Sequence, residues 1–274
     1  MSDFNSFAPG YAARRPQLVW HRIIADTETP VSAMLKLGRG GSGAFLLESV
    51  EGGAVRGRYS LLGLEPDLVW RATGNAAEIN TQWATDTTAF VPCAGDTLTE
   101  LRALVASCRM DVPPELPRAL ACLVGYMGYE TARLAEKLPE PKADPLGVPD
   151  FLFVRPTLLL VFDRLRDELF IVAPVFPDAR SAEVAHAAAL ERIESAAARL
   201  AQPVPAARQT PADLPDGAAH HVLRPGRYAE MVARARDYIF AGDIFQVVLA
   251  QRFTVDFRLR PFDMYRALRC IDRS

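Results

Sequence analysis

Three side chains that could bind the charged groups of a small molecule lie close together between residues 44 and 70. Glu48 and Ser49 end an apolar run that starts at Phe45, and Arg58 follows a glycine-containing turn region. If the two runs pair as neighbouring strands, a carboxylate, a hydroxyl and a guanidinium meet at the strand ends. Glu48 could then face an ammonium group or orient an arginine, while Ser49 and Arg58 face a carboxylate, so the pattern suits both charges of an amino acid. An ion pair at the end of a surface hairpin, worth little energetically, is the ordinary alternative.

The usual catalytic motifs do not occur in the sequence. It has no Gly-x-Ser-x-Gly elbow, no phosphate-binding P-loop, no His-Glu-x-x-His and no acidic calcium loop. The four cysteines lack the close pairs of a zinc site, and His220 and His221 have no third ligand nearby. His186 is expected to face out of an Ala-rich helix. The residues by themselves therefore predict no complete active site.

Composition limits the classes of protein to which the chain can belong. Its 274 residues are half hydrophobic, enough for a substantial core and about two domains. A formal charge of −2 argues against binding to nucleic acid or to an acidic membrane surface, because both need clustered positive charge. No apolar run reaches membrane-spanning length, and the N-terminal segment does not look like a signal peptide. With free thiols as well, the sequence predicts a cytoplasmic protein.

Apolar spacing indicates a strand-rich N-terminal block. Runs of β-branched and aromatic residues predict strands at 44–49, at 58–63, in a segment bounded by Pro66 and Gly74, and twice within 153–175. Apolar residues three or four apart predict helices at 97–110 and 181–202, and Thr29 followed by Pro30 suits the start of a short helix at 29–38. Thr29 and Thr97 are the expected capping residues. Gly125 and Gly128 indicate a strand in close backbone contact, followed by a helix that ends at Pro139.

A proline-rich segment separates this block from a second one. Residues 203–219 show no periodicity and few large apolar residues, which predicts a linker. A helix from Pro225 to Gly242, a long apolar strand at 244–257 and a helix starting at Pro261 are expected after it. The predicted organisation is a flexible N-terminus at 1–16, a first domain at 17–202, a linker at 203–221 and a second domain at 222–274. The second domain is expected to be incomplete, because about fifty residues cannot close a core around a strand buried on both faces.

Several blocks of the sequence resemble one enzyme family. They are, in order, LLES at 46–49, GRYSLLGLEPDLVW at 57–70, LVGYMGYETARLAEKLP at 123–139, PTLLLVFDRLRDELFIV at 156–172 and GDIFQVVLAQRF at 242–253. From about residue 17 to the end, the chain is similar to component I, the large chorismate-binding subunit, of anthranilate synthase. The resemblance implies a lyase of tryptophan biosynthesis that converts chorismate and ammonia into anthranilate and pyruvate with Mg²⁺. It also implies a hetero-oligomer with a glutamine amidotransferase, component II.

The resemblance implies a fold and a site as well. The implied fold is α+β, with largely antiparallel sheets and flanking helices, which agrees with the hairpins and meander predicted above. In the family, the Leu-Leu-Glu-Ser segment helps to form the feedback site for tryptophan. Ser49 is therefore the implied effector contact with Glu48 beside it, and Arg58 is the implied basic contact, with Tyr59 as its alternative.

The catalytic residues of the family have no counterpart in this chain. The family's magnesium-binding glutamates, its catalytic histidine and its chorismate contacts lie in a C-terminal half that follows the matched segment. We therefore expect neither catalytic nor metal-binding residues among these 274 residues, and no synthase activity from them alone.

Other functions remain open at the level of sequence. Aminodeoxychorismate synthase component I shares the implied fold and substrate; AEKLP at 135–139 and GDIFQVVLAQRF look more like the anthranilate branch, but the lysine-bearing segment that separates the two lies beyond Ser274. Isochorismate and salicylate synthases fit less well, because they usually lack so clear a Leu-Leu-Glu-Ser block. A non-catalytic module that binds an amino acid or docks a subunit is the alternative from another class.

Overall fold

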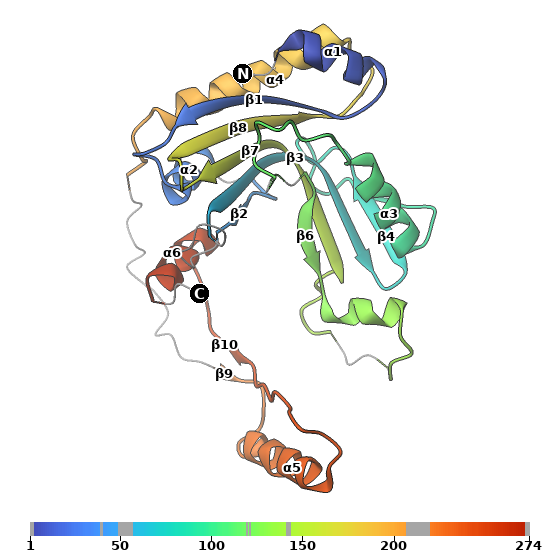
Figure 1. Ribbon diagram of the computed structural model, residues 1–274. Helices are drawn as coiled ribbons and strands as arrows, with labels where there is room; N and C mark the ends of the chain where they lie inside the picture. Colours follow the sequence, from blue (N-terminus) through green and yellow to red (C-terminus); the bar gives the residue numbers. More distant parts are fainter. Residues whose placement is uncertain are drawn as a thin grey trace. The chain divides into compact units, whose positions relative to one another are not determined.

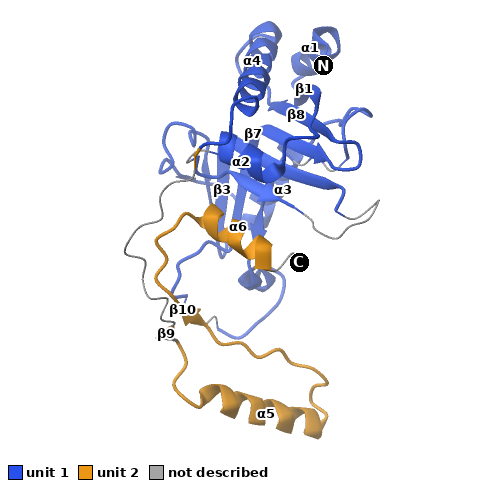
Figure 2. Ribbon diagram, turned by 90° about the vertical axis from the view of Figure 1, so that its left-hand side faces the viewer, with its two compact units in different colours: residues 1–205, 274 blue, residues 206–273 orange. Residues whose placement is uncertain are grey.

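A computed structural model describes residues 3–38, 41–48, 57–118, 120, 122–140, 144–206 and 220–271. The chain divides into two compact units, residues 1–205 and 206–273, and each is described by itself (Figures 1 and 2). Ser49, the Gly52–Gly53 turn and most of the expected linker lie outside the described residues.

Unit 1 is built on one sheet of eight strands. They are β1 (Gln17–Ile24), β2 (Phe45–Leu47), β3 (Tyr59–Thr73), β4 (Ala76–Asn80), β5 (Val91–Pro92), β6 (Val124–Met127), β7 (Phe151–Asp163) and β8 (Glu168–Val175). The main path runs β1-β8-β7-β3-β4-β5, with β2 beside β3 and β6 beside β7. Every pair in the described part of this sheet is antiparallel, and helices pack outside it, so the expected α+β class is confirmed.

The single strand β3 replaces two predicted strands. The sequence suggested separate strands before and after Pro66, whereas β3 runs through this residue for 15 residues. Its ladder with β7 shifts register between Pro66 and Leu68, so the proline, which has no N–H to donate, is accommodated at an irregularity of the ladder. Because β3 is continuous, its first half pairs with β2 and its second half with β4.

The helices predicted at 29–38, 97–110 and 181–202 form, and unit 1 also has a helix at 4–12, where none was predicted. The helices of unit 1 are α1 (Phe4–Ala12), α2 (Pro30–Leu37), α3 (Thr97–Ser107), the 3₁₀ helix η1 (Tyr129–Leu134) and α4 (Ala182–Leu200). Thr29 caps α2 as predicted, because its hydroxyl accepts a hydrogen bond from the Ser32 N–H at 3.0 Å. The predicted cap of α3 was wrong by one residue: the carboxylate of Asp96, not Thr97, accepts from the Thr99 N–H at 3.0 Å.

Alternate residues of the sheet face two different apolar clusters. On one face, Leu160 and Ile171 pack with Ile193 of α4, and α1 and α2 lie on the same side (Figure 1). Their sequence neighbours Leu159 and Val172 point to the opposite face and join a second cluster. This period of two is what a sheet buried on both faces requires.

Residues Phe4–Ala12 form the helix α1 within the segment 1–16, for which the sequence predicted a flexible lead-in. Phe7 and Tyr11 of α1 are buried, and they pack toward α4. His186 of α4 is also buried, with 8% of its surface exposed, and its ring lies 5.3 Å from Phe4 and 5.0 Å from Phe7 between centroids. The prediction that His186 faces solvent was therefore wrong, because α1 covers that side of the helix.

Unit 2 consists of short elements. They are β9 (His220–His221), α5 (Arg227–Ala241), β10 (Phe253–Thr254) and α6 (Pro261–Ile271). Gly242 ends α5 with a φ of 80° and Pro261 begins α6, as predicted. The long strand expected at 244–257 is not formed: only Phe253 and Thr254 are in a strand, paired with β9. A strand forms only where a neighbouring strand pairs with it. In the described part of unit 2, β9 offers two residues for pairing, so β10 is two residues long.

Neither unit contains, among its described residues, a helix with the length and apolar character needed to cross a membrane.

Candidate functional site

Glu48 and Arg58 lie at the same end of the sheet of unit 1. Glu48 directly follows β2, whose last residue, Leu47, is opposite Leu61 of β3. Arg58 directly precedes β3, whose first residue, Tyr59, is opposite Asp163 at the end of β7. The antiparallel pairing predicted from sequence therefore brings these two side chains to one edge, next to the turn that joins β7 to β8.

The carboxylate of Glu48 is held by an arginine from that turn. Its Oε1 accepts a hydrogen bond of 2.8 Å from Nη2 of Arg164, and 1% of the Glu48 side chain is exposed. A carboxylate this far removed from water needs a charged or hydrogen-bonding partner, which Arg164 supplies. Glu48 thus meets an arginine, as the sequence suggested, but the arginine lies 116 residues away.

Arg58 forms a two-pronged ion pair with Asp163. Its Nε donates to Oδ1 at 2.8 Å and its Nη2 to Oδ2 at 2.5 Å. The side chain of Asp163 is 3% exposed, whereas that of Arg58 is 23% exposed. This geometry fixes the plane of the guanidinium and leaves Nη1 on its far side.

The pKa values of the pair reflect this contact. The hydrogen bond to Asp163 raises the pKa of Arg58, against the opposing effect of burial. Burial would raise the pKa of Asp163, but the hydrogen bonds from Arg58 and from the Leu165 N–H bring it below its ordinary value. Both groups are therefore charged at neutral pH. The sequence indicated solvation for Asp163 as a hairpin-tip residue, and the structure instead buries it.

Two ion pairs lie at this end of the sheet. Arg58 pairs with Asp163, and Arg164 pairs with Glu48. The site therefore carries both signs of charge, as a zwitterionic ligand does. Tyr59 lies beside Arg58, whose guanidinium carbon is 4.9 Å from the centre of the tyrosine ring.

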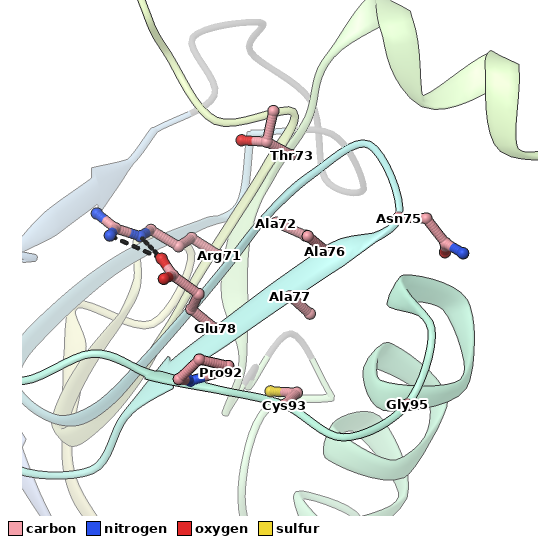
Figure 3. A pocket seen from close by; sticks show the side chains of 10 residues that line it. All are labelled: Arg71, Ala72, Thr73, Asn75, Ala76, Ala77, Glu78, Pro92, Cys93 and Gly95. Carbon is pink, nitrogen blue, oxygen red and sulfur yellow. Dashed lines mark hydrogen bonds and ion pairs between the residues drawn. The ribbon is translucent and has the colours of Figure 1, made fainter.

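A separate pocket of about 450 Å³ lies on the β3–β4 hairpin. Figure 3 shows its lining residues: Arg71, Ala72, Thr73, Asn75, Ala76, Ala77, Glu78, Pro92, Cys93 and Gly95. Arg71 is paired with Glu78 at 2.7 Å and stacks on Phe90, with its guanidinium carbon 3.8 Å from the ring centre. The pocket contains none of the residues predicted to bind an amino acid.

The described residues do not fit a metal centre. Among them, no group of three or more His, Cys, Asp or Glu side chains could hold a metal ion. The described residues therefore provide no ligand set for the Mg²⁺ that the resemblance implies.

The chain is similar to known proteins over most of its length. Residues 50–274 match the family described as chorismate binding enzyme. The chain is 44% identical over 270 residues to anthranilate synthase component 1 of Cereibacter sphaeroides, which covers 98% of this chain and 54% of that relative. It is 38% identical over 258 residues to the protein of that name from Thermus thermophilus, covering 92% of this chain and 50% of the relative.

A solved structure gives the same picture of the fold. The crystal structure of anthranilate synthase component I from Streptococcus pneumoniae superimposes with a TM-score of 0.62 at 27% sequence identity. The match covers 93% of this chain and 53% of the solved chain. The chain therefore spans about half the length of the relatives that it matches.

Proposed function

Because the chain belongs to the family of chorismate-binding enzymes, we propose that it is the N-terminal portion of an anthranilate synthase component I. The observation that carries this proposal is the 44% identity, over 98% of this chain, to a relative of that name. The proposed reaction belongs to tryptophan biosynthesis and converts chorismate and ammonia into anthranilate and pyruvate. Residues 17–202 are the proposed regulatory domain, and residues 222–274 begin the proposed chorismate-binding domain.

The proposal includes Mg²⁺ and a partner subunit. The metal ligands and the catalytic residues are expected in the part of the relatives' length that these 274 residues do not span. The ammonia is expected from a glutamine amidotransferase, component II, in a hetero-oligomer.

The reaction is tested by product analysis. The native polypeptide that contains these residues, combined with component II, chorismate, glutamine and Mg²⁺, is expected to release anthranilate and pyruvate, which fluorescence and mass spectrometry detect. The 274-residue polypeptide alone, with ammonium in place of glutamine, is expected to release none. Aminodeoxychorismate as the product would contradict the assignment and support the other branch of the family.

Tryptophan is the proposed feedback effector, bound at Ser49, Glu48 and Arg58. The presence of both signs of charge in the ion pairs of Glu48 and Arg58 supports a zwitterionic ligand. Ser49 follows Glu48 directly in the sequence, and a serine hydroxyl can both donate and accept a hydrogen bond.

Replacing Ser49 by alanine tests the effector site. Loss of a hydrogen bond to a charged group of the ligand predicts binding of tryptophan about tenfold weaker in titration calorimetry, and a matching rise in the concentration that inhibits the native enzyme. Ser42→Ala, at an exposed position in the preceding turn, is the matched control. Unchanged tryptophan affinity in Ser49→Ala would remove this residue from the site. Binding of tryptophan by a native protein that forms no product would instead favour a non-catalytic module.

A further inference from the structure

The turn between β7 and β8 supplies both partners of the effector residues. Asp163 and Arg164 are consecutive, yet the side chains that they contact, Arg58 and Glu48, are ten residues apart in the sequence. Asp163 contacts Arg58, and Arg164 contacts Glu48. We infer that residues 163–167, called here the β7–β8 turn, position Glu48 and Arg58 for the effector; this inference rests on the proposed tryptophan site.

Two backbone N–H groups of the β7–β8 turn hold it in place next to the start of β3. The Arg164 N–H donates to the carbonyl oxygen of Arg58 at 3.0 Å, and the Leu165 N–H donates to Oδ1 of Asp163 at 3.1 Å. The register of the ladder places Asp163 opposite Tyr59. The side chains of Asp163 and Arg164 therefore start from fixed backbone positions, which reduces the conformational freedom that a positioning contact must overcome.

Burial makes these contacts stronger than ordinary surface pairs. The Glu48 and Asp163 side chains are both almost fully buried, while Arg58 and Arg164 reach toward solvent. A buried carboxylate without its cation would rotate toward water or take up a proton. In either case the carboxylate would no longer have the orientation or charge that binding of the ligand requires. Asp163 and Arg164 are thus positioning residues that act through Arg58 and Glu48.

Arg164→Met is the first test, with L-tryptophan as the probe and titration calorimetry on the native protein as the measurement. It is expected to weaken tryptophan binding about tenfold, as for the loss of one charge-assisted hydrogen bond, while KM for chorismate is unchanged. Arg164→Lys, which keeps a cation but not the planar guanidinium, is expected to restore part of the affinity. Arg102→Met is the matched control, because Arg102 is an exposed arginine of α3, outside this turn, and the variant is expected to leave the affinity unchanged.

A double-mutant cycle separates positioning from general stabilisation. If Arg164 acts through Glu48, adding Arg164→Met to Glu48→Gln costs no further affinity, whereas independent effects would multiply.

Asp163→Asn is expected to weaken tryptophan binding in the same way through Arg58. The reciprocal effect is also measurable: tryptophan should slow hydrogen exchange at the amides of Arg164 and Leu165.

The outcomes distinguish this inference from the function on which it rests. Tight tryptophan binding by the unaltered protein together with normal affinity in Arg164→Met and Asp163→Asn would overturn the positioning role and leave the effector site standing. Multiplying effects in the Glu48 cycle would also overturn it. No tryptophan binding by the unaltered native protein would overturn the effector site itself, and the positioning role with it.

Discussion

At the scale of single residues, the kinds of side chain could be predicted but their partners could not. The run from Phe45 to Arg58 indicated a carboxylate and a guanidinium at strand ends, and the structure brings Glu48 and Arg58 to one edge of the sheet. Asp163 and Arg164 gave no signal in the sequence, because a charged pair at a hairpin tip is usually solvated. Their roles become visible only when β7 lies beside β3.

The carboxylate of Asp178 holds the N-terminal helix α1 in place through a hydrogen bond to Tyr11. Its Oδ1 accepts a hydrogen bond of 3.0 Å from the Tyr11 hydroxyl, and its Oδ2 accepts one of 2.8 Å from Nε of Arg180. The hydrogen bond from Arg180 lowers the pKa of Asp178 to about 2, with smaller contributions from the Arg180 N–H and Tyr11, although burial opposes the shift. A depressed pKa means that the contribution of Asp178 to stability is fully present above its unfolded pKa of about 3.9 and is lost as the pH falls toward 2.

Asp178→Asn is therefore expected to lower the free energy of unfolding by about 1 kcal/mol at pH 7, a value reduced for solvent screening because the Asp178 side chain is 44% exposed. The difference from the unaltered chain should shrink as the pH falls from 4 to 2. Urea denaturation at a series of pH values measures both effects. Asp111→Asn, at an exposed position, is the control, and an equal loss of stability there would contradict the assignment.

At the scale of elements, glycine marks a place where two backbones approach. Gly125 lies in β6 opposite Phe153 of β7, and a Cβ added to it would overlap the carbonyl oxygen of Leu152 and the Cα of Phe153. The predicted close contact at this strand is confirmed. The helix expected after β6 is the 3₁₀ helix η1, six residues long, so the element was foreseen and its type was not.

Gly125→Ala is expected to destabilise unit 1 by about 2 kcal/mol, because the backbone of β7 cannot move away as a flexible side chain could. Thermal or urea denaturation measures the change. Gly41→Ala is the matched control, since a Cβ at Gly41 meets nothing within 4 Å and its φ is not in the left-handed region. Similar denaturation midpoints for the two variants would show that β6 tolerates the added methyl group.

At the scale of the whole molecule, burial differs sharply between the two units. Unit 1 holds three apolar clusters on its sheet, whereas residues 220 and 222–271 of unit 2 are all at least partly exposed. Phe245 and Val248, in the apolar segment predicted as a long strand, are 93% and 84% exposed. Apolar burial is the main favourable term in folding, so the elements of unit 2 should open at a lower free energy than those of unit 1.

Hydrogen exchange of the 274-residue polypeptide tests this difference. Amides of α5 and α6 are expected to exchange at least about tenfold faster than amides in the centres of β3 and β7, because local opening of unit 2 exposes little apolar surface. The helices of unit 1, α3 and α4, serve as the internal comparison for helical amides. Equal protection of α4 and α5 would contradict the prediction.

The sequence by itself determined the family, the α+β class, most helices and strands, and the types of the charged residues Glu48 and Arg58 at one end of the sheet. These depend on motifs and on periodicity within a few residues, which a single chain displays directly. Only the tertiary structure decided that β3 is continuous through Pro66, that α1 covers His186, and that Asp163 and Arg164 hold Arg58 and Glu48. The two ion pairs join residues 105 and 116 positions apart, and no local pattern encodes which distant side chain will be the partner.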